Sequence, residues 1–248
     1  MEGKYFRYCC KMECMEIQLA VAKINKYASS ESGDSVEVVE RPNGGISVVM
    51  ADGQSSGKGA KYISFLVVRK VISLLSEGVR DGAAARAASD HLFTERKGKV
   101  SATLNIVSID MQTGTMVITR NNPVPVLIAS AEEISAFDDE CVPIGLYRDT
   151  RPLINELPLE PGLTVVIFTD GLVHAGSRTG ETIDIKTCLQ SLLEDEEPDP
   201  QEIADSLLAH AVQIDHGRPV DDISVVVIQV TSNQGDQVRR MTVRLPLV

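Results

Sequence analysis

Two predicted β-hairpins, with two predicted helices between them, limit the folds open to this chain. The segments DSVEVVER and GISVVMA are rich in β-forming residues, and the intervening PNGG (42–45) favours a turn, so residues 34–51 are predicted to form an antiparallel pair. The segment VSATLNIVSIDMQTGTMVITRNN alternates and turns at residues 112–114, which predicts a second hairpin. The predicted sheets therefore grow by hairpins.

Helices and further strands complete the pattern. Apolar residues recur at helical spacing in segments 58–77, 83–98, 185–200 and 201–214. Short apolar runs at 125–130 and 223–230 are predicted strands, and so is the start of LTVVIFTDGLVHA (163–175), where the strand stops at the Asp170-Gly171 pair. The segment 15–25 fits either a strand or a short helix. The order of strands, two helices, strands, two helices and strand predicts an α+β fold, with sheets packed face to face and helix pairs outside. No repeat or linker divides the sequence, so we expect a single domain over residues 1–230 and a C-terminal tail, 231–248, without an assigned role.

Composition narrows the class of protein. A chain of 248 residues with 43% hydrophobic content can fill a core. Its formal charge of −11, from 24 basic and 35 acidic residues, argues against a nucleic-acid partner, which requires clustered positive charge. No apolar run is as long as a membrane span and no secretory leader is recognisable, so we expect a cytoplasmic protein with no membrane partner. A monomer is expected.

Cysteines do not form a recognisable site. Three of the five, Cys9, Cys10 and Cys14, lie in CCKMEC with no matching Cys or His cluster to complete a zinc site. They are predicted to be reduced thiols.

Aspartates at the ends of apolar strands are the candidate chemical groups. Asp52 closes VVMAD, Asp170 closes VVIFTD, and Asp221 with Asp222 opens ISVVVIQV. Carboxylates gathered in a cleft repel one another unless protons or cations offset their charge. Mg²⁺ and Mn²⁺ prefer oxygen ligands of this kind. The three strand ends therefore favour a divalent metal site, although spacing alone does not establish that they converge.

Other interpretations of these segments stay open or are weaker. A single Asp-Gly pair, as at 52–53 or 170–171, is typical of a turn. The stretch ADGQSSGKGA lacks the spacing of a nucleotide-binding P-loop. No motif pairs a Ser or Cys nucleophile with a histidine. His174 fits either a structural role or a role as hydrogen-bond donor to a phosphate or to a metal-bound water. Any chemistry is therefore expected to be metal-assisted.

Four ordered motifs carry a family resemblance. The segments ESGDSVEV, VVMADGQSSGKGA, VIFTDGLVHA and PVDDISVVVI resemble the metal-dependent serine/threonine protein phosphatases of the PPM family, and within it the SpoIIE-like branch. The resemblance covers about residues 15–230. It implies an αββα four-layer sandwich, with two antiparallel sheets flanked by helix pairs, which agrees with the element order.

The resemblance also assigns roles to residues. It makes Asp52 the carboxylate that bridges two Mn²⁺ or Mg²⁺ ions, with the Gly53 carbonyl on the second ion. Asp170 and Asp221 would hold the first ion, with Asp222 as the neighbouring candidate, and Asp34 would contact the second ion. Asp52, Asp170 and Asp221 are thus the expected catalytic set. No arginine occupies a clear phosphate-clamping position, which departs from some members.

The implied reaction is hydrolysis of phosphoserine or phosphothreonine by a metal-bridging hydroxide. Members of this branch act on phosphorylated STAS-domain proteins, such as anti-sigma-factor antagonists and stressosome components, so such a phosphoprotein is the expected substrate. The motifs begin almost at the N-terminus, as in stand-alone stressosome phosphatases. The alternatives are a catalytically inactive binding module with this fold and a hydrolase of small phosphoesters.

Overall fold

The computed structural model describes residues 15–130, 133–195, 198–232 and 238–246. The predicted thiols Cys9, Cys10 and Cys14 lie outside these ranges. The described chain forms two five-stranded sheets in which every neighbouring pair of strands is antiparallel.

The first sheet combines the N-terminal strand with the later strands of the chain. Its order is β1-β10-β9-β6-β7. The strands are β1 (Met15–Ile24), β6 (Val126–Ala129), β7 (Ile134–Phe137), β9 (Thr164–Phe168) and β10 (Ile223–Ser232). The segment 15–25, for which the sequence fits a strand or a helix, is thus a strand, and it pairs along its whole length with β10.

The second sheet holds both predicted hairpins. Its order is β2-β3-β4-β5-β8. The strands are β2 (Asp34–Glu40), β3 (Ile46–Gly53), β4 (Ala102–Asp110), β5 (Thr115–Asn121) and β8 (Leu153–Pro158). Alternation places Val48 and Met50 on one face of β3, and Val49 and Ala51 on the other.

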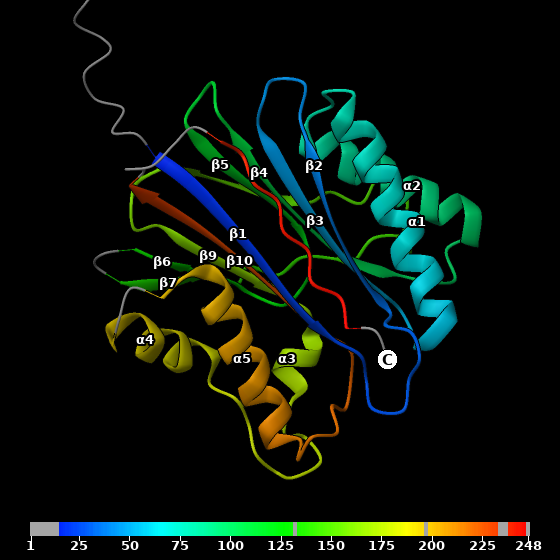
Figure 1. Cartoon of the computed structure of the whole chain (residues 1–248). Coiled ribbons are helices and arrows are strands. Elements are labelled where there is room, and N and C mark those ends of the chain that lie inside the picture. The colour runs from blue at the N-terminus through cyan, green and yellow to red at the C-terminus, as the bar shows by residue number, and fades with distance from the viewer. Residues whose placement is uncertain (1–14, 131–132, 196–197, 233–237, 247–248) are drawn as a thin grey trace, which may run out of the picture.

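Helices cover the outer face of each sheet (Figure 1). The pair α1 (Gly57–Ser76) and α2 (Asp81–Arg96) lies on the second sheet, while α3 (Asp170–His174), α4 (Ile185–Asp195) and α5 (Pro200–Ile214) lie on the side of the first. At α5 the Asp199 side chain accepts a hydrogen bond from the Glu202 N–H, and Pro200 occupies the first turn, which explains why the helix begins there. The predicted four-layer αββα sandwich is confirmed.

Three apolar clusters fill the spaces between layers. One lies between the sheets and includes Met50, Val107, Val165 and Val226, all at most 1% exposed. The other two join each sheet to its helices. The two sheets are therefore held face to face.

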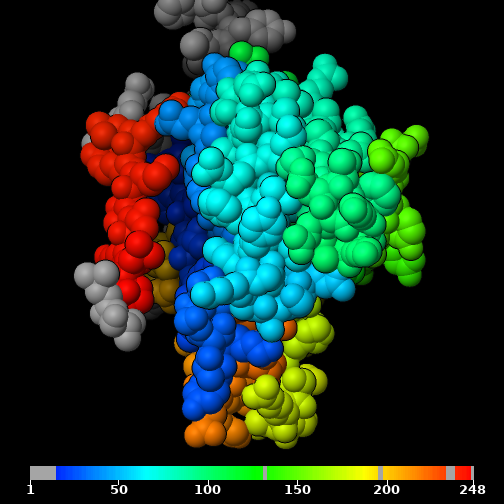
Figure 2. All heavy atoms as spheres, turned by 90° about the vertical axis from the view of Figure 1, so that its right-hand side faces the viewer, coloured from blue at the N-terminus to red at the C-terminus, as the bar shows by residue number. Residues whose placement is uncertain are grey.

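The C-terminal segment 238–246 carries no helix or strand and runs along the flank of the sandwich beside the N-terminal strands (Figure 2). Arg239 anchors it by donating to the Gly44 carbonyl and lying 3.7 Å from the Glu40 carboxylate. No helix in the described ranges combines the length and apolar character needed to cross a bilayer.

Candidate metal centre

A cavity of about 360 Å³ opens where the two sheets meet at one end of the sandwich. All of the residues predicted for the metal site line it: Asp34, Asp52, Gly53, Asp170, Asp221 and Asp222. Further lining residues come from the loop after β3, the start of β4 with the loop before it, and the loops after β5 and β7, and include Gln54, Ser55, Ser101, Thr103, Pro123 and Pro143. Residues up to 188 positions apart in the sequence, from 34 to 222, thus face one space.

The second sheet contributes Asp34 and Asp52 through strand register. Asp34 is the first residue of β2 and pairs directly with Asp52, near the end of β3. The two carboxylates therefore share one face at neighbouring positions. Asp34 is 1% exposed, and its Oδ2 accepts hydrogen bonds from the hydroxyls of Thr169 (3.0 Å) and Ser224 (2.6 Å), which belong to the other sheet's side of the cavity.

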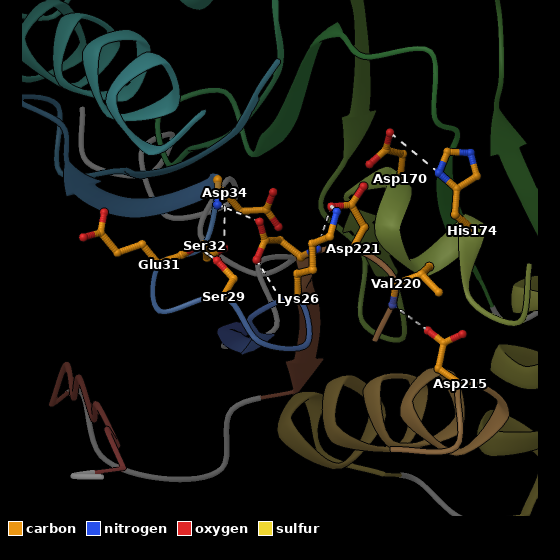
Figure 3. A network of polar contacts seen from close by, with 12 residues as sticks. Lys26, Ser29, Glu31, Ser32, Asp34, Asp170, His174, Asp215, Val220 and Asp221 are labelled. Atoms are coloured by element: carbon orange, nitrogen blue, oxygen red, sulfur yellow. Dashed lines mark hydrogen bonds and ion pairs between the residues drawn. The ribbon is translucent and has the colours of Figure 1, made fainter. Parts of the chain in front are cut away.

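The first sheet contributes Asp170 and Asp221. Asp170 opens α3 directly after β9, and Asp221 precedes β10, the strand paired with β9. Both side chains are 40% exposed, and Figure 3 shows them turned toward each other. His174, one turn after Asp170, lies with its Nδ1 3.9 Å from the Asp170 carboxylate.

Asp222 differs from its neighbour. Its side chain is 6% exposed, and its two oxygens accept backbone N–H groups from Lys26 (2.9 Å) and Gly33 (2.7 Å). These bonds fix the loop between β1 and β2 that leads into Asp34. Asp222 lines the cavity, but the exposed carboxylate of the pair is Asp221, the residue that the family pattern ranks first.

Both glycines of the Asp-Gly pairs are required by close packing. A Cβ at Gly53 would lie 2.1 Å from the Ala60 carbonyl oxygen of α1, and a Cβ at Gly171 would lie 2.0 Å from the Asp222 carbonyl oxygen. Neither glycine has a positive φ. The Asp-Gly sequences therefore allow backbone segments to approach beside each aspartate.

Electrostatics at the cavity oppose the charged forms of the carboxylates. Burial raises the pKa of Asp52 to about 9, and the nearby Asp34 and Asp170 carboxylates add to the effect. Burial also raises the pKa of Asp34 to about 6, against the hydrogen bonds from Ser224 and the positive charge of Lys23. The pKa of Asp170 is raised by burial and by Asp221. Protons or cations must offset this charge.

The donor chemistry fits a hard divalent cation. Five carboxylates and the Gly53 carbonyl supply oxygen ligands of the type that Mg²⁺ and Mn²⁺ prefer. As placed in the described chain, no three His, Cys, Asp or Glu side chains form a group that could hold an ion. The carboxylates thus face one cavity, but no three of them in the described residues lie close enough together to ligate the same ion.

Sequence reasoning missed the residues that support these carboxylates. Thr169 and Ser224 bind each other, since the Ser224 N–H donates to the Thr169 hydroxyl, and both bind Asp34. The ammonium groups of Lys23 and Lys61 both donate to the Asp34 carbonyl oxygen, at 2.6 and 3.0 Å. Their sequence context gives no signal, because hydroxyl and lysine side chains beside a strand end are common on ordinary surfaces.

The family follows from comparison with known sequences. The family model described as Stage II sporulation protein E (SpoIIE) matches residues 42–231, more than half of the chain. This chain belongs to the SpoIIE family. Stage II sporulation protein E of Bacillus subtilis is 24% identical over 204 residues, which cover 82% of this chain and 24% of that protein. The chain thus spans about a quarter of the length of that relative.

Solved structures agree with this assignment at the level of the fold. The PP2C phosphatase domain of SpoIIE from Bacillus subtilis, solved with a fragment of its regulatory domain, has a TM-score of 0.77 and 20% identity, covering 89% of this chain and 65% of that one. RsbX in complex with magnesium has a TM-score of 0.66 and 18% identity, covering 87% and 96%. The fold is that of these phosphatase structures, and the predicted resemblance to the SpoIIE-like branch is confirmed.

Proposed function

We propose that this domain is a serine/threonine phosphoprotein phosphatase that depends on Mn²⁺ or Mg²⁺. The observation that carries the proposal is the convergence of five carboxylates from both sheets on one cavity, in a chain of the SpoIIE family. A binding module does not need so many carboxylates at the cost in repulsion and burial that their raised pKa values indicate.

The chain's own residues have separable roles in this proposal. Asp52, Asp170 and Asp221 would hold the cations, with Asp34 and the Gly53 carbonyl on the second of two ions. When bound, such ions supply a nucleophile at neutral pH and offset charge on the phosphoryl oxygens. The hydroxyls of Thr169 and Ser224 keep Asp34 facing the cavity, and Asp222 holds the loop that precedes it.

We further propose that the substrate is a phosphoserine or phosphothreonine on a STAS-domain signalling protein, acted on in the cytoplasm. The family match and the likeness to RsbX support this class of substrate. Asp170 and Asp221 are both 40% exposed, so this side of the cavity is accessible to a side chain presented by a folded protein.

One assay tests the proposal. Purified protein should release phosphate from a phosphoserine STAS-domain protein with Mn²⁺ and not with chelator, and Asp52→Asn should reduce turnover to the level seen in chelator. Asp110→Asn is the matched control, because Asp110 also ends a strand of the same sheet but binds the turn N–H groups of Gln112 and Thr113. Activity that persists in chelator or in Asp52→Asn contradicts the proposal, and turnover of small esters alone favours a small phosphoester hydrolase.

A further inference from the structure

A buried carboxylate outside the cavity connects the two loops that carry Asp170 and Asp221. Asp215 directly follows α5, and its side chain is only 5% exposed. Its Oδ1 accepts the Gly176 N–H at 2.9 Å and its Oδ2 accepts the Val220 N–H at 3.1 Å. Figure 3 shows the second of these bonds, with Asp221 next along the chain.

We propose that Asp215 is a positioning residue for the candidate metal centre, and this inference rests on the proposed function. Gly176 lies just beyond α3, whose first residue is Asp170, and Val220 immediately precedes Asp221. One side chain therefore fixes the exit of the short helix that begins with Asp170 and the entry to Asp221. Both carboxylates would keep their place at the cavity only while these bonds hold.

Other hydrogen bonds hold the same two loops around Asp215. The Thr179 hydroxyl donates to the carbonyls of Gly176 (2.9 Å) and Ile214 (3.2 Å), which ties the loop after α3 to the end of α5. Gly176 has φ +82°, and a Cβ there would lie 2.6 Å from the Glu181 carbonyl oxygen, so this loop has little room to rearrange. The backbone N–H of Tyr27 donates to the Pro219 carbonyl at 3.0 Å, which fixes the loop before Asp221 from its other side.

The chemistry of the junction requires an aspartate. An ionised carboxylate offers two acceptor oxygens and no donor, so it can accept both N–H groups, whereas an asparagine amide offers one acceptor and directs an NH₂ group at the other N–H. Hydrogen bonds to a charged acceptor are also the stronger kind. Asp215→Asn therefore keeps the shape of the side chain and loses one of the two attachments.

The matched control lies at the opposite end of the same helix. Asp199 also accepts a backbone N–H, that of Glu202 at 2.9 Å, but it caps the start of α5 and connects no loop of the cavity. Asp199→Asn and Asp215→Asn make the same chemical change at the two ends of α5. A merely structural role predicts that Asp215→Asn, at a residue 5% exposed, lowers thermal stability, that Asp199→Asn, at an exposed cap which asparagine also suits, has little effect, and that neither variant changes metal binding.

The experiment is a titration of the full chain with Mn²⁺, in which free Mn²⁺ is measured by electron paramagnetic resonance. We expect Asp215→Asn to weaken Mn²⁺ binding about 10- to 100-fold, as removal of a group that orients metal ligands typically does, and Asp199→Asn to leave it within about twofold. Amide hydrogen exchange should become faster at Gly176 or Val220 in Asp215→Asn alone. Turnover at saturating Mn²⁺ should recover toward that of the unaltered protein.

The outcomes distinguish the positioning role of Asp215 from the proposed function. Unaltered Mn²⁺ affinity in Asp215→Asn, or an equal loss in Asp199→Asn, overturns the positioning role and leaves the proposed function in place. Failure of the unaltered protein to bind Mn²⁺ overturns the proposed function and the positioning role with it. If Asp215→Asn does not fold, amide hydrogen exchange of the unaltered protein is the test: the Gly176 and Val220 N–H groups, which donate to Asp215, should both exchange more slowly when Mn²⁺ is bound, and unaltered exchange at both overturns the inference.

Discussion

At the scale of single residues, Asp52 and Asp34 behave as proton-binding groups in the metal-free domain. Their pKa values of about 9 and about 6 both lie above the ordinary value of 3.8, because burial and neighbouring carboxylates disfavour their charged forms. The native state therefore holds protons that the unfolded chain releases near pH 4. A divalent cation would take the place of these protons.

This displacement predicts a pH dependence of stability with a definite sign. A carboxyl whose pKa is raised on folding contributes stability that is fully present below its unfolded pKa and is lost as pH rises through its folded pKa. Between about pH 4 and pH 9 the free energy of unfolding of the chelated protein should therefore fall by at most about 1.4 kcal/mol per pH unit for each such proton. Urea unfolding in chelator at several pH values measures the slope.

Asp52→Asn isolates the contribution of that group. The amide cannot titrate, so the slope of unfolding free energy against pH should become shallower above pH 6 in this variant, while Asp110→Asn keeps the slope of the unaltered protein. If unfolding free energy has the same slope against pH in Asp52→Asn and Asp110→Asn, Asp52 is ionised in the native state and the prediction of a shallower slope is wrong.

The affinity for Mn²⁺ should also depend on pH. Since Mn²⁺ displaces protons, its affinity for the unaltered protein should increase from pH 6 to pH 8.

At the scale of elements, the contact between β3 and α1 depends on Gly53. A Cβ there would lie 2.1 Å from the Ala60 carbonyl oxygen and 3.0 Å from the Ser64 backbone nitrogen, so Gly53→Ala must displace the first turns of α1. We expect this variant to lose about 1–3 kcal/mol of unfolding free energy, as overpacked sites do, and to lose turnover because the carbonyl beside Asp52 moves. Thermal unfolding and the phosphatase assay measure both effects.

Gly59 provides the control within the same helix. A Cβ at Gly59 meets only the Ser55 hydroxyl, at 3.7 Å, and the residue is exposed in the first turn of α1. Gly59→Ala should therefore raise stability by up to about 1 kcal/mol through helix propensity. If the protein tolerates Gly53→Ala, so that its stability and turnover match those of Gly59→Ala, then α1 moves freely at this contact and the prediction is wrong.

The elements that the sequence predicted well are those with a long, regular pattern. Both hairpins and the four longer helices were evident from period and turn residues. Strand β8 was missed, because it is short, follows Pro152 and ends at Pro158, and prolines favour a loop. These prolines are tolerated because β8 is the edge strand of its sheet, next to β5. Strand β7, with four residues, has too few positions for a period. The apolar strand predicted to stop at the Asp170-Gly171 pair does so, ending at Phe168, but the short helix α3 that begins at Asp170 was not predicted.

The identity of the site residues could be predicted from the sequence, but their positions relative to one another could not. Each strand-end aspartate was visible in the sequence, whereas the Asp34 to Asp52 pairing follows from strand register, and the approach of Asp170 and Asp221 follows from the stacking of two sheets. Asp215 could not be found in this way, because an aspartate after an amphipathic helix is typical of an exposed helix end. Its burial depends on loops that are distant in sequence.

At the scale of the whole molecule, the cavity lies across the contact between the two halves of the sandwich. Asp52 belongs to one sheet, Asp170 and Asp221 flank the other, and Asp34 already connects them through Thr169 and Ser224. A cation bound between these groups would therefore stabilise both halves together, since it binds only when both are folded and docked.

This arrangement predicts one cooperative unfolding transition whose midpoint rises with Mn²⁺. The stabilisation should reach about 2.7 kcal/mol at a Mn²⁺ concentration a hundred times the dissociation constant. Asp52→Asn, in one half, and Asp170→Asn, in the other, should each remove most of the Mn²⁺ effect, whereas Asp110→Asn should retain it. Calorimetry with and without Mn²⁺ measures the shift. If Mn²⁺ stabilised Asp170→Asn as strongly as the unaltered protein, the ion would be held by one half alone, and a site shared between the sheets would be wrong.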